Sequence, residues 1–310
     1  MRLVFVRWLL PLSLLLLTLG APDARAQSIP SDFLALEFPS AHNDGNILRG
    51  YLSRASDPAN AGAKEPVVVA LHGCGGLWNA RGGLDTRYRD YQAWFKARGV
   101  SLLLVDSFST RGKPRGICTE PLANRDIRPA DRRLDVQGAL KWLQTQPWVD
   151  TQRLLLLGWS HGGSTVLSTL DRQVAQGHTA LGWPSELPDF KAAIAFYPGC
   201  TPASRNSDYR LDTPLLLLIG EEDDWTPAAS CERFHRYQTS QLLQRGLETW
   251  RFQLKLYPGA HHGFDSNNPV RRRPEVPNGT QRGKGVTAGG HPPSRDDALT
   301  TMDAFLKQYL

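Results

Sequence analysis

The sequence predicts an α/β fold: a doubly wound, mostly parallel sheet with an antiparallel N-terminal hairpin. Three observations predict it. From residue 67 to the C-terminus, short apolar runs that suit buried strands alternate with amphipathic stretches that suit helices. This alternation is typical of βαβ units, whose strands pair in parallel. Before it, residues 33–53 contain two strand-like segments with no helical pattern between them.

Residues 1–26 are typical of a secretory signal peptide. Arg2 and Arg7 supply a positive start, residues 8–19 form an apolar run too short to span a bilayer, and Ala24-Arg25-Ala26 suits cleavage. An uncleaved membrane anchor is the alternative. We expect residues 27–310 to form a single domain that is periplasmic or secreted, with no stable membrane insertion after signal cleavage.

Each element follows from its local pattern. Alternating residues in segment 46–53 predict an antiparallel edge hairpin with segment 33–38. The apolar runs predict further strands at residues 67–71, 102–105, 154–157, 192–196, 215–219 and 252–256. The amphipathic runs predict helices at residues 86–98, 131–144, 228–245 and 296–309. In such sheets ligands bind beyond the carboxyl ends of the strands, so the residues just after each strand are the candidates for a site.

A glycine-rich turn follows the four leucines of the strand at 154–157. It reads Gly158-Trp159-Ser160-His161-Gly162, the G-x-S-x-G pattern. Glycines permit a very sharp strand-to-helix turn that leaves a serine Oγ exposed, so Ser160 is the candidate nucleophile. A glycine-rich helix cap is the alternative, and the buried strand before the turn favours the catalytic interpretation.

A serine hydroxyl needs a base to take its proton and a carboxylate to orient that base. In serine hydrolases of this elbow type, the order along the chain is serine, acid, histidine. Carboxylates at residues 221–224 follow the strand at 215–219, and His261 and His262 follow the strand at 252–256. Both groups therefore fall at the carboxyl end of a predicted strand. His161 is too close to the elbow to serve as the base.

The oxyanion of an acyl-transfer intermediate also needs hydrogen-bond donors, and losing one typically costs on the order of 10²-fold or more in rate. The segment His72-Gly73-Cys74-Gly75-Gly76 follows the first parallel strand, and its glycines allow N–H groups to face a cleft. We expect the N–H groups of Cys74 and His161 to form the oxyanion hole. A thiol nucleophile at Cys74 is the disfavoured alternative, because no elbow surrounds it.

Four cysteines in an exported chain predict two disulfides, with three alternative connectivities. We favour Cys74–Cys118 and Cys200–Cys231, because each pair joins neighbouring loops that follow predicted strands. Free thiols are the alternative.

These motifs resemble the dienelactone hydrolase family of serine α/β-hydrolases, in which G-x-S/C-x-G, G-x-x-D-x-x-x-P and a late G/A-H-x-F follow successive strands. The resemblance spans residues 67–310 and implies the α/β-hydrolase fold. It also implies Ser160 as nucleophile, Asp223 as acid and His262 as base. The neighbouring Asp224 is then expected to cap the next helix or meet solvent. The namesake enzymes have a cysteine at the elbow, where this chain has Ser160.

Substrate contacts are the least specified part of the prediction. Aromatic side chains adjoin the candidate site in sequence, with core packing as the alternative role: Trp78, Trp159, Tyr197 and Trp225. Arg111 is a candidate to receive an acidic substrate group, with a surface arginine as the alternative. Residues 267–291, rich in Pro, Gly and Arg, form a long insertion that we expect to be a lid, a binding loop or disordered.

The sequence thus predicts an exported serine hydrolase that cleaves a small-molecule carboxylic ester or lactone through an acyl-enzyme, without a metal or other cofactor. A prolyl-oligopeptidase-like peptidase and a non-catalytic binding module on the same fold are the alternatives. The formal charge of +6 is mild, and the basic run at 271–273 lacks interleaved aromatics, which argues against nucleic-acid binding. The sequence carries no signal for the oligomeric state.

Overall fold

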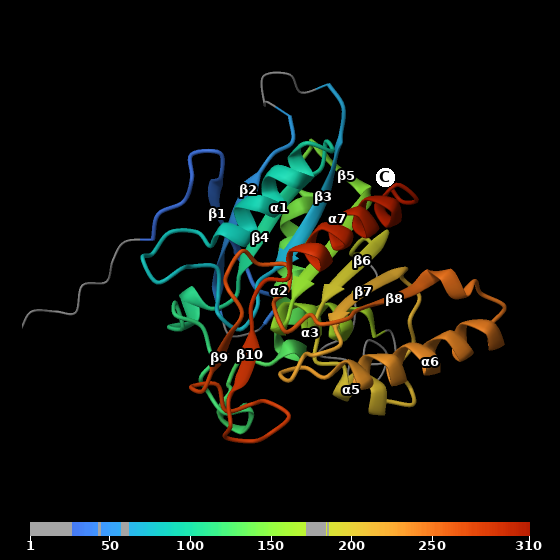
Figure 1. The fold of residues 1–310 in the computed structure, drawn as a ribbon. Coiled ribbons are helices and arrows are strands. Elements are labelled where there is room, and N and C mark those ends of the chain that lie inside the picture. Colours follow the sequence, from blue (N-terminus) through green and yellow to red (C-terminus); the bar gives the residue numbers. More distant parts are fainter. Residues whose placement is uncertain (1–26, 43–44, 57–61, 172–183, 185) are drawn as a thin grey trace, which may run out of the picture.

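The computed structural model describes residues 27–42, 45–56, 62–171, 184 and 186–310. The expected signal peptide, residues 1–26, lies outside the described residues. An eight-stranded sheet forms the centre of the molecule, in the order β1-β2-β4-β3-β5-β6-β7-β8, with helices packed on both faces (Figure 1). The predicted fold class is therefore confirmed.

The strands of this sheet begin and end close to the predicted runs, except β5, which begins five residues before the predicted run 154–157 and ends two residues after it. They are β1 (Leu34–Pro39), β2 (Ile47–Ser53), β3 (Glu65–Leu71), β4 (Ser101–Asp106), β5 (Val149–Trp159), β6 (Ala192–Phe196), β7 (Leu215–Gly220) and β8 (Phe252–Tyr257). The pairs β1–β2 and β2–β4 are antiparallel, and the remaining pairs are parallel. Strands β3, β4, β6 and β7 are buried along their whole length, which explains their apolar composition.

The helices lie between the strands and at the C-terminus. They are α1 (Thr86–Lys96), α2 (Pro129–Gln144), α3 (His161–Leu170), α5 (Thr201–Arg205), α6 (Ala228–Gln244) and α7 (Pro292–Leu306), with short 3₁₀ turns η2 (Ser109–Arg111), η3 (Leu122–Asn124) and η4 (Thr249–Arg251). Among the described residues, no helix combines the length and apolar character needed to cross a bilayer.

The chain reverses its direction across the sheet at β4. The connection from β3 through α1 to β4 runs one way, and the connection from β4 through α2 to β5 runs back. Because such crossovers are right-handed, α1 covers one face, and α2, α3 and α6 cover the other. Helix α7 returns to the face of α1, where Asp303 pairs with Arg98 at 2.7 Å (Figure 1).

This reversal positions the candidate site. Adjacent strands β3 and β5 send their following segments in opposite directions, which opens a crevice at their carboxyl ends. The predicted oxyanion segment follows β3, and Ser160 follows β5. The fold therefore brings these two segments to the same edge of the sheet.

Both favoured disulfides are present. Cys74–Cys118 ties the loop after β3 to the loop after β4, and Cys200–Cys231 ties the start of α5 to α6. The predicted insertion at 267–291 contains a small antiparallel pair, β9 (Arg271–Arg273) and β10 (Val286–Ala288). We refer to residues 271–288 as the insertion hairpin.

Candidate active site

Ser160 lies on the turn between β5 and α3, at φ 53° and ψ −113°, a conformation that residues with a side chain rarely adopt. The flanking glycines make the turn possible. A Cβ on Gly158 would lie 2.3 Å from Gly162 O, and a Cβ on Gly162 would lie 2.0 Å from Leu71 O. The two glycines thus allow a backbone approach beside β3 that any larger residue would block.

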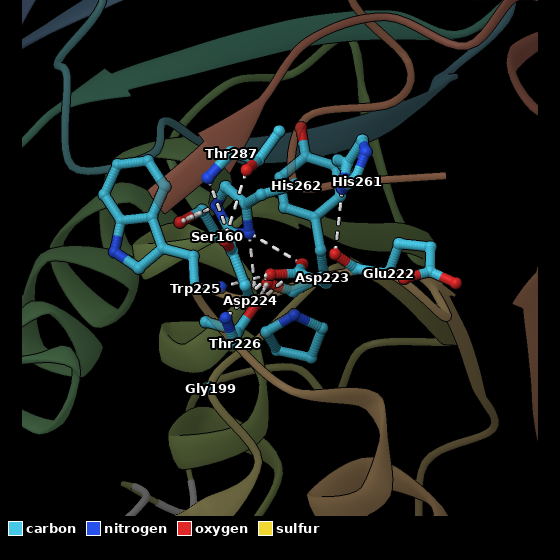
Figure 2. A network of polar contacts seen from close by, with 12 residues as sticks. Ser160, Gly199, Glu222, Asp223, Asp224, Trp225, Thr226, His261, His262 and Thr287 are labelled. Carbon is cyan, nitrogen blue, oxygen red and sulfur yellow. Dashed lines mark hydrogen bonds and ion pairs between the residues drawn. The ribbon is translucent and has the colours of Figure 1, made fainter. Parts of the chain in front are cut away.

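The three residues predicted as nucleophile, base and acid form a continuous chain of hydrogen bonds (Figure 2). Ser160 Oγ lies 2.9 Å from His262 Nε2, and His262 Nδ1 lies 2.8 Å from Asp223 Oδ2. They come from the loops after β5, β8 and β7. Because the carboxylate accepts at Nδ1, the proton of a neutral ring sits there, and Nε2 presents a lone pair to the serine hydroxyl.

The acid is held by more than the histidine. The N–H groups of Trp225 and Thr226 donate to Asp223 Oδ1 at 2.9 and 2.7 Å, and the Thr226 hydroxyl lies 3.0 Å from Oδ2. Asp223 itself is buried, so these bonds fix its carboxylate plane. Sequence reasoning missed Thr226, although an Asp side chain in a loop commonly accepts the N–H groups of the residues that follow it, as in an Asx turn.

Asp224 has a different role from the one expected. It neither caps α6 nor faces only solvent. Its Oδ1 accepts the Thr287 N–H at 2.7 Å, and its Oδ2 pairs with Arg272 Nη1 at 3.0 Å (Figure 2 shows Asp224 and Thr287). The acid loop therefore carries two carboxylates with separate partners: Asp223 holds the histidine, and Asp224 holds the insertion hairpin.

His262 contacts two aromatic rings and is bonded to the insertion. The ring centroids of Tyr197 and Trp225 each lie 4.6 Å from the imidazole. Gly289 N–H donates to His262 O at 3.0 Å, next to the single β-bridge between His262 and Ala288. His261 points elsewhere, with Nδ1 2.9 Å from Glu222 O. The choice between the adjacent histidines thus agrees with the geometry.

The two segments expected to supply oxyanion donors lie next to Ser160. A Cβ on Gly73 would lie 3.5 Å from Ser160 Cβ, which places the Gly73–Cys74 segment beside the serine. Cys74 is held by its disulfide and by the Ile117 N–H, which donates to Cys74 O at 2.7 Å. His161 is the first residue of α3, so its N–H has no helical acceptor.

Three expected substrate contacts need correction. Trp159 is fully buried and packs against Tyr88 and Tyr91, because it points into the core while the next residue points out. Tyr197 is 1% exposed and supports the back of the His262 ring. Arg111 forms a two-bonded ion pair with Asp135, at 2.8 and 2.7 Å, so its charge is already paired.

Two of the expected substrate contacts, Trp78 and Trp225, are partly exposed. Trp225 packs on His262 with the guanidinium of Arg273 5.4 Å from its ring. Trp78 donates its Nε1–H toward Asp106 and Ser109, each at 3.1 Å. Both stay predictions as substrate contacts. In the part of the chain that the structure describes, no cluster of three or more His, Cys, Asp or Glu side chains could hold a metal ion.

A further polar network, with Asp265 buried and Arg87 partly exposed, lies behind the Tyr197 ring that contacts His262. Tyr197 OH donates to Asp265 Oδ1 at 2.7 Å, and Arg87 Nε lies 3.3 Å from Asp265 Oδ2. Burial, the largest cause, raises the pKa of Tyr197 well above its usual value, so the phenol stays a donor. Sequence reasoning missed Arg87 and Asp265. The only hint in the sequence is that Asp265 closely follows the candidate base, His262.

Comparisons with known proteins agree with this architecture. Residues 49–310 match the family model described as the dienelactone hydrolase family. A polyketide transferase of Aspergillus fumigatus is 30% identical over 239 residues, covering 72% of this chain and 70% of the relative. A probable 2-oxo-3-(5-oxofuran-2-ylidene)propanoate lactonase of Bradyrhizobium is 22% identical over 257 residues, covering 79% and 90%.

Among solved structures, a thermophilic esterase of Thermogutta terrifontis has a TM-score of 0.60 at 18% identity, covering 90% of this chain and 94% of that one. This likeness shows the α/β-hydrolase fold. The family match spans most of the sequence, so the chain is an esterase- or lactonase-like α/β-hydrolase and belongs to the dienelactone hydrolase family.

Proposed function

We propose that this protein is an exported serine hydrolase that cleaves a small-molecule carboxylic ester or lactone through an acyl-enzyme. The observation that carries the proposal is the hydrogen-bond chain from Ser160 Oγ through His262 to Asp223, with distances of 2.9 and 2.8 Å. A binding module would have no use for a nucleophile, a base and an oriented acid in this order.

Each group then has a defined step. His262 Nε2 takes the Ser160 proton as Oγ attacks the carbonyl carbon, and Asp223 stabilises the imidazolium that forms. The N–H groups of Cys74 and His161 bind the oxyanion. His262 returns the proton to the leaving alkoxide, and the acyl-serine remains. A water molecule, deprotonated by the same imidazole, releases the acid and restores the enzyme.

Labelling with a fluorophosphonate tests the proposal, because the reagent reacts with an activated serine. We expect one adduct at Ser160, and Ser160→Ala should lose both the adduct and about 10³-fold or more of kcat towards p-nitrophenyl esters. His261→Gln is the matched control for His262→Gln, and only the latter should lose activity. An unlabelled wild-type protein would contradict the proposal. Cleavage of peptide anilides in preference to the matching esters would favour a peptidase.

Export rests on two separate features. Residues 1–26 have the composition of a signal peptide, and both cysteine pairs form disulfides, which persist in oxidising compartments. We expect the full-length precursor, expressed in a bacterium, to yield a periplasmic or secreted protein whose first residue is Gln27. Intact mass analysis of each cell fraction measures this. A protein that keeps Met1 and four alkylatable thiols would contradict export.

A further inference from the structure

Arg132 on α2 is a fully buried cation that contacts both segments of the expected oxyanion hole. Its Nη1 donates to His72 O at 2.9 Å and to His161 Nδ1 at 3.0 Å. His72 lies two residues before Cys74, and His161 is the first residue of α3. One guanidinium nitrogen therefore joins the loop after β3 to the start of α3.

The two histidines that receive these bonds are themselves fixed. His161 Nε2–H donates to Ile127 O at 3.1 Å, which leaves Nδ1 as the acceptor for Arg132. His72 Nδ1–H donates to Gly73 O at 2.8 Å, and its Nε2 accepts the Ser107 N–H at 3.2 Å. Burial first, and then the Arg132 charge, lower the pKa of both imidazoles well below the usual value, so both are neutral.

Arg132 has no carboxylate partner among the described residues. Asp135, on the same helix, uses both carboxylate oxygens on Arg111. Nε and Nη2 of Arg132 find no hydrogen-bond partner in the described part of the chain, and its guanidinium carbon lies 5.1 Å from the Phe108 ring centroid. Burial lowers the pKa of Arg132 to about 10, so the side chain stays charged at neutral pH.

A buried charge without a paired carboxylate is costly to a fold. Bonds to a carbonyl and an imidazole could be made by a neutral donor, so holding these segments together does not by itself require a cation. A cation is useful where negative charge appears only during the reaction, because it then stabilises the transition state more than the bound substrate.

We propose that Arg132 is a positioning residue of the oxyanion hole, which sets the spacing of the Cys74 and His161 N–H groups and places a positive charge behind them. The inference rests on the proposed function of Ser160. It predicts an effect on kcat rather than on KM, since the oxyanion is absent from the ground state.

The chain offers a matched control one residue away. Arg133 is also buried on α2, with 2% of its surface exposed against 0% for Arg132. Burial lowers the pKa of Arg133, and the negative charge of Asp171 opposes that shift. Consecutive side chains of an α-helix point about 100° apart, so Arg133 leaves α2 in a different direction from Arg132. Arg132→Met and Arg133→Met should therefore cost similar stability, because each removes a buried guanidinium, while only the first alters the hole.

The experiment measures kcat and KM for p-nitrophenyl butyrate, together with the rate of Ser160 phosphonylation by a fluorophosphonate. We expect Arg132→Met to lower kcat and phosphonylation alike by about 10- to 100-fold, with KM changed less than about threefold, whereas Arg133→Met changes none of them by more than about threefold. Arg132→Lys keeps the positive charge but not the geometry of the guanidinium bonds. Its kcat and phosphonylation rate should therefore lie between those of the wild type and those of Arg132→Met.

Equal kcat values in the Arg132→Met and Arg133→Met proteins would overturn the assignment. If Arg132→Met does not fold, Arg132→Lys decides, and wild-type kcat and phosphonylation in that variant would overturn it as well. A wild-type enzyme that does not react with the fluorophosphonate would instead contradict the proposed function of Ser160.

Discussion

At the residue scale, two adjacent carboxylates after β7 serve two different structures. Asp223 turns towards His262, whereas Asp224 turns towards Arg272 and Thr287 on the insertion hairpin. Neighbouring side chains of an irregular loop point in different directions, so one residue of shift in the chain would exchange the two roles. The pair is therefore a sensitive test of the site.

Replacing Asp223 by Asn would present an amide to His262 Nδ1 and favour the wrong tautomer. We expect Asp223→Asn to lose at least about 10²-fold in kcat/KM, and Asp224→Asn to lose less than about tenfold. Asp224→Asn should instead speed amide hydrogen exchange across residues 271–288, because the Arg272 ion pair is lost. Steady-state kinetics and exchange on both folded variants measure this. Greater kinetic damage in Asp224→Asn would contradict the assignment of the acid.

Single residues also show what a sequence can and cannot indicate. Ser160, Asp223 and His262 could be singled out because each sits in a short motif directly after an apolar run, and in the structure hydrogen bonds connect the three. Trp159 and Tyr197 were misjudged, since nearness in sequence does not tell which way a side chain points. Arg132 could not be found, because it reaches the site from the first turn of α2 through contacts 60 and 29 residues distant in the chain.

At the scale of elements, the long strands and helices were predictable because apolar runs form buried strands and amphipathic runs form helices buried on one face. The insertion hairpin was not. Its Pro, Gly and Arg content suggests a loop, and the bonds that hold it come from distant residues, Asp224 and His262. Local propensity cannot report such long-range partners.

The two disulfides provide a test at this scale. They close loops of similar length, with sequence separations of 44 and 31, so each should contribute about 4 kcal/mol on the loop-entropy model. We expect Cys74→Ala/Cys118→Ala and Cys200→Ala/Cys231→Ala to lose similar stability in urea unfolding. Only the first pair should lower kcat, by about tenfold, because Cys74 carries an expected oxyanion donor. Equal kcat values in both double variants would refute a role of that bond in the site.

At the scale of the whole molecule, buried histidines link stability to pH. Burial is the largest cause that lowers the pKa of three described histidines: His72, His161 and His235. In the unfolded chain each returns to about 6.5. Below that pH the unfolded state binds more protons than the folded state, so the free energy of unfolding falls as the pH falls.

We therefore expect full stability above about pH 6.5 and a decline towards pH 5, approaching about 1.4 kcal/mol per pH unit for each of His72 and His161 and less for His235, whose pKa is lowered less. Carboxylates of the unfolded chain titrate mainly below about pH 5, so they contribute little in this window. Urea unfolding at several pH values measures the slope. His235 lies on α6, away from the site. His235→Gln should reduce this slope by at most the contribution of one proton, about 1.4 kcal/mol per pH unit. A stability independent of pH between 7 and 5 would show that these histidines keep ordinary pKa values.

The backbone of Ser160 implies a conflict between durability and activity. At φ 53° and ψ −113°, a residue with a side chain costs the folded state about 1–3 kcal/mol in backbone strain. Glycine adopts such mirror-image conformations without that strain. It costs only about 0.5–1 kcal/mol of stability, because it makes the unfolded chain more flexible. Ser160→Gly should therefore unfold at higher urea than Ser160→Ala, although neither has the hydroxyl. Selection for thermal stability alone would then favour glycine at this turn. If Ser160 is the nucleophile that we propose, the protein keeps it at a cost in folding stability.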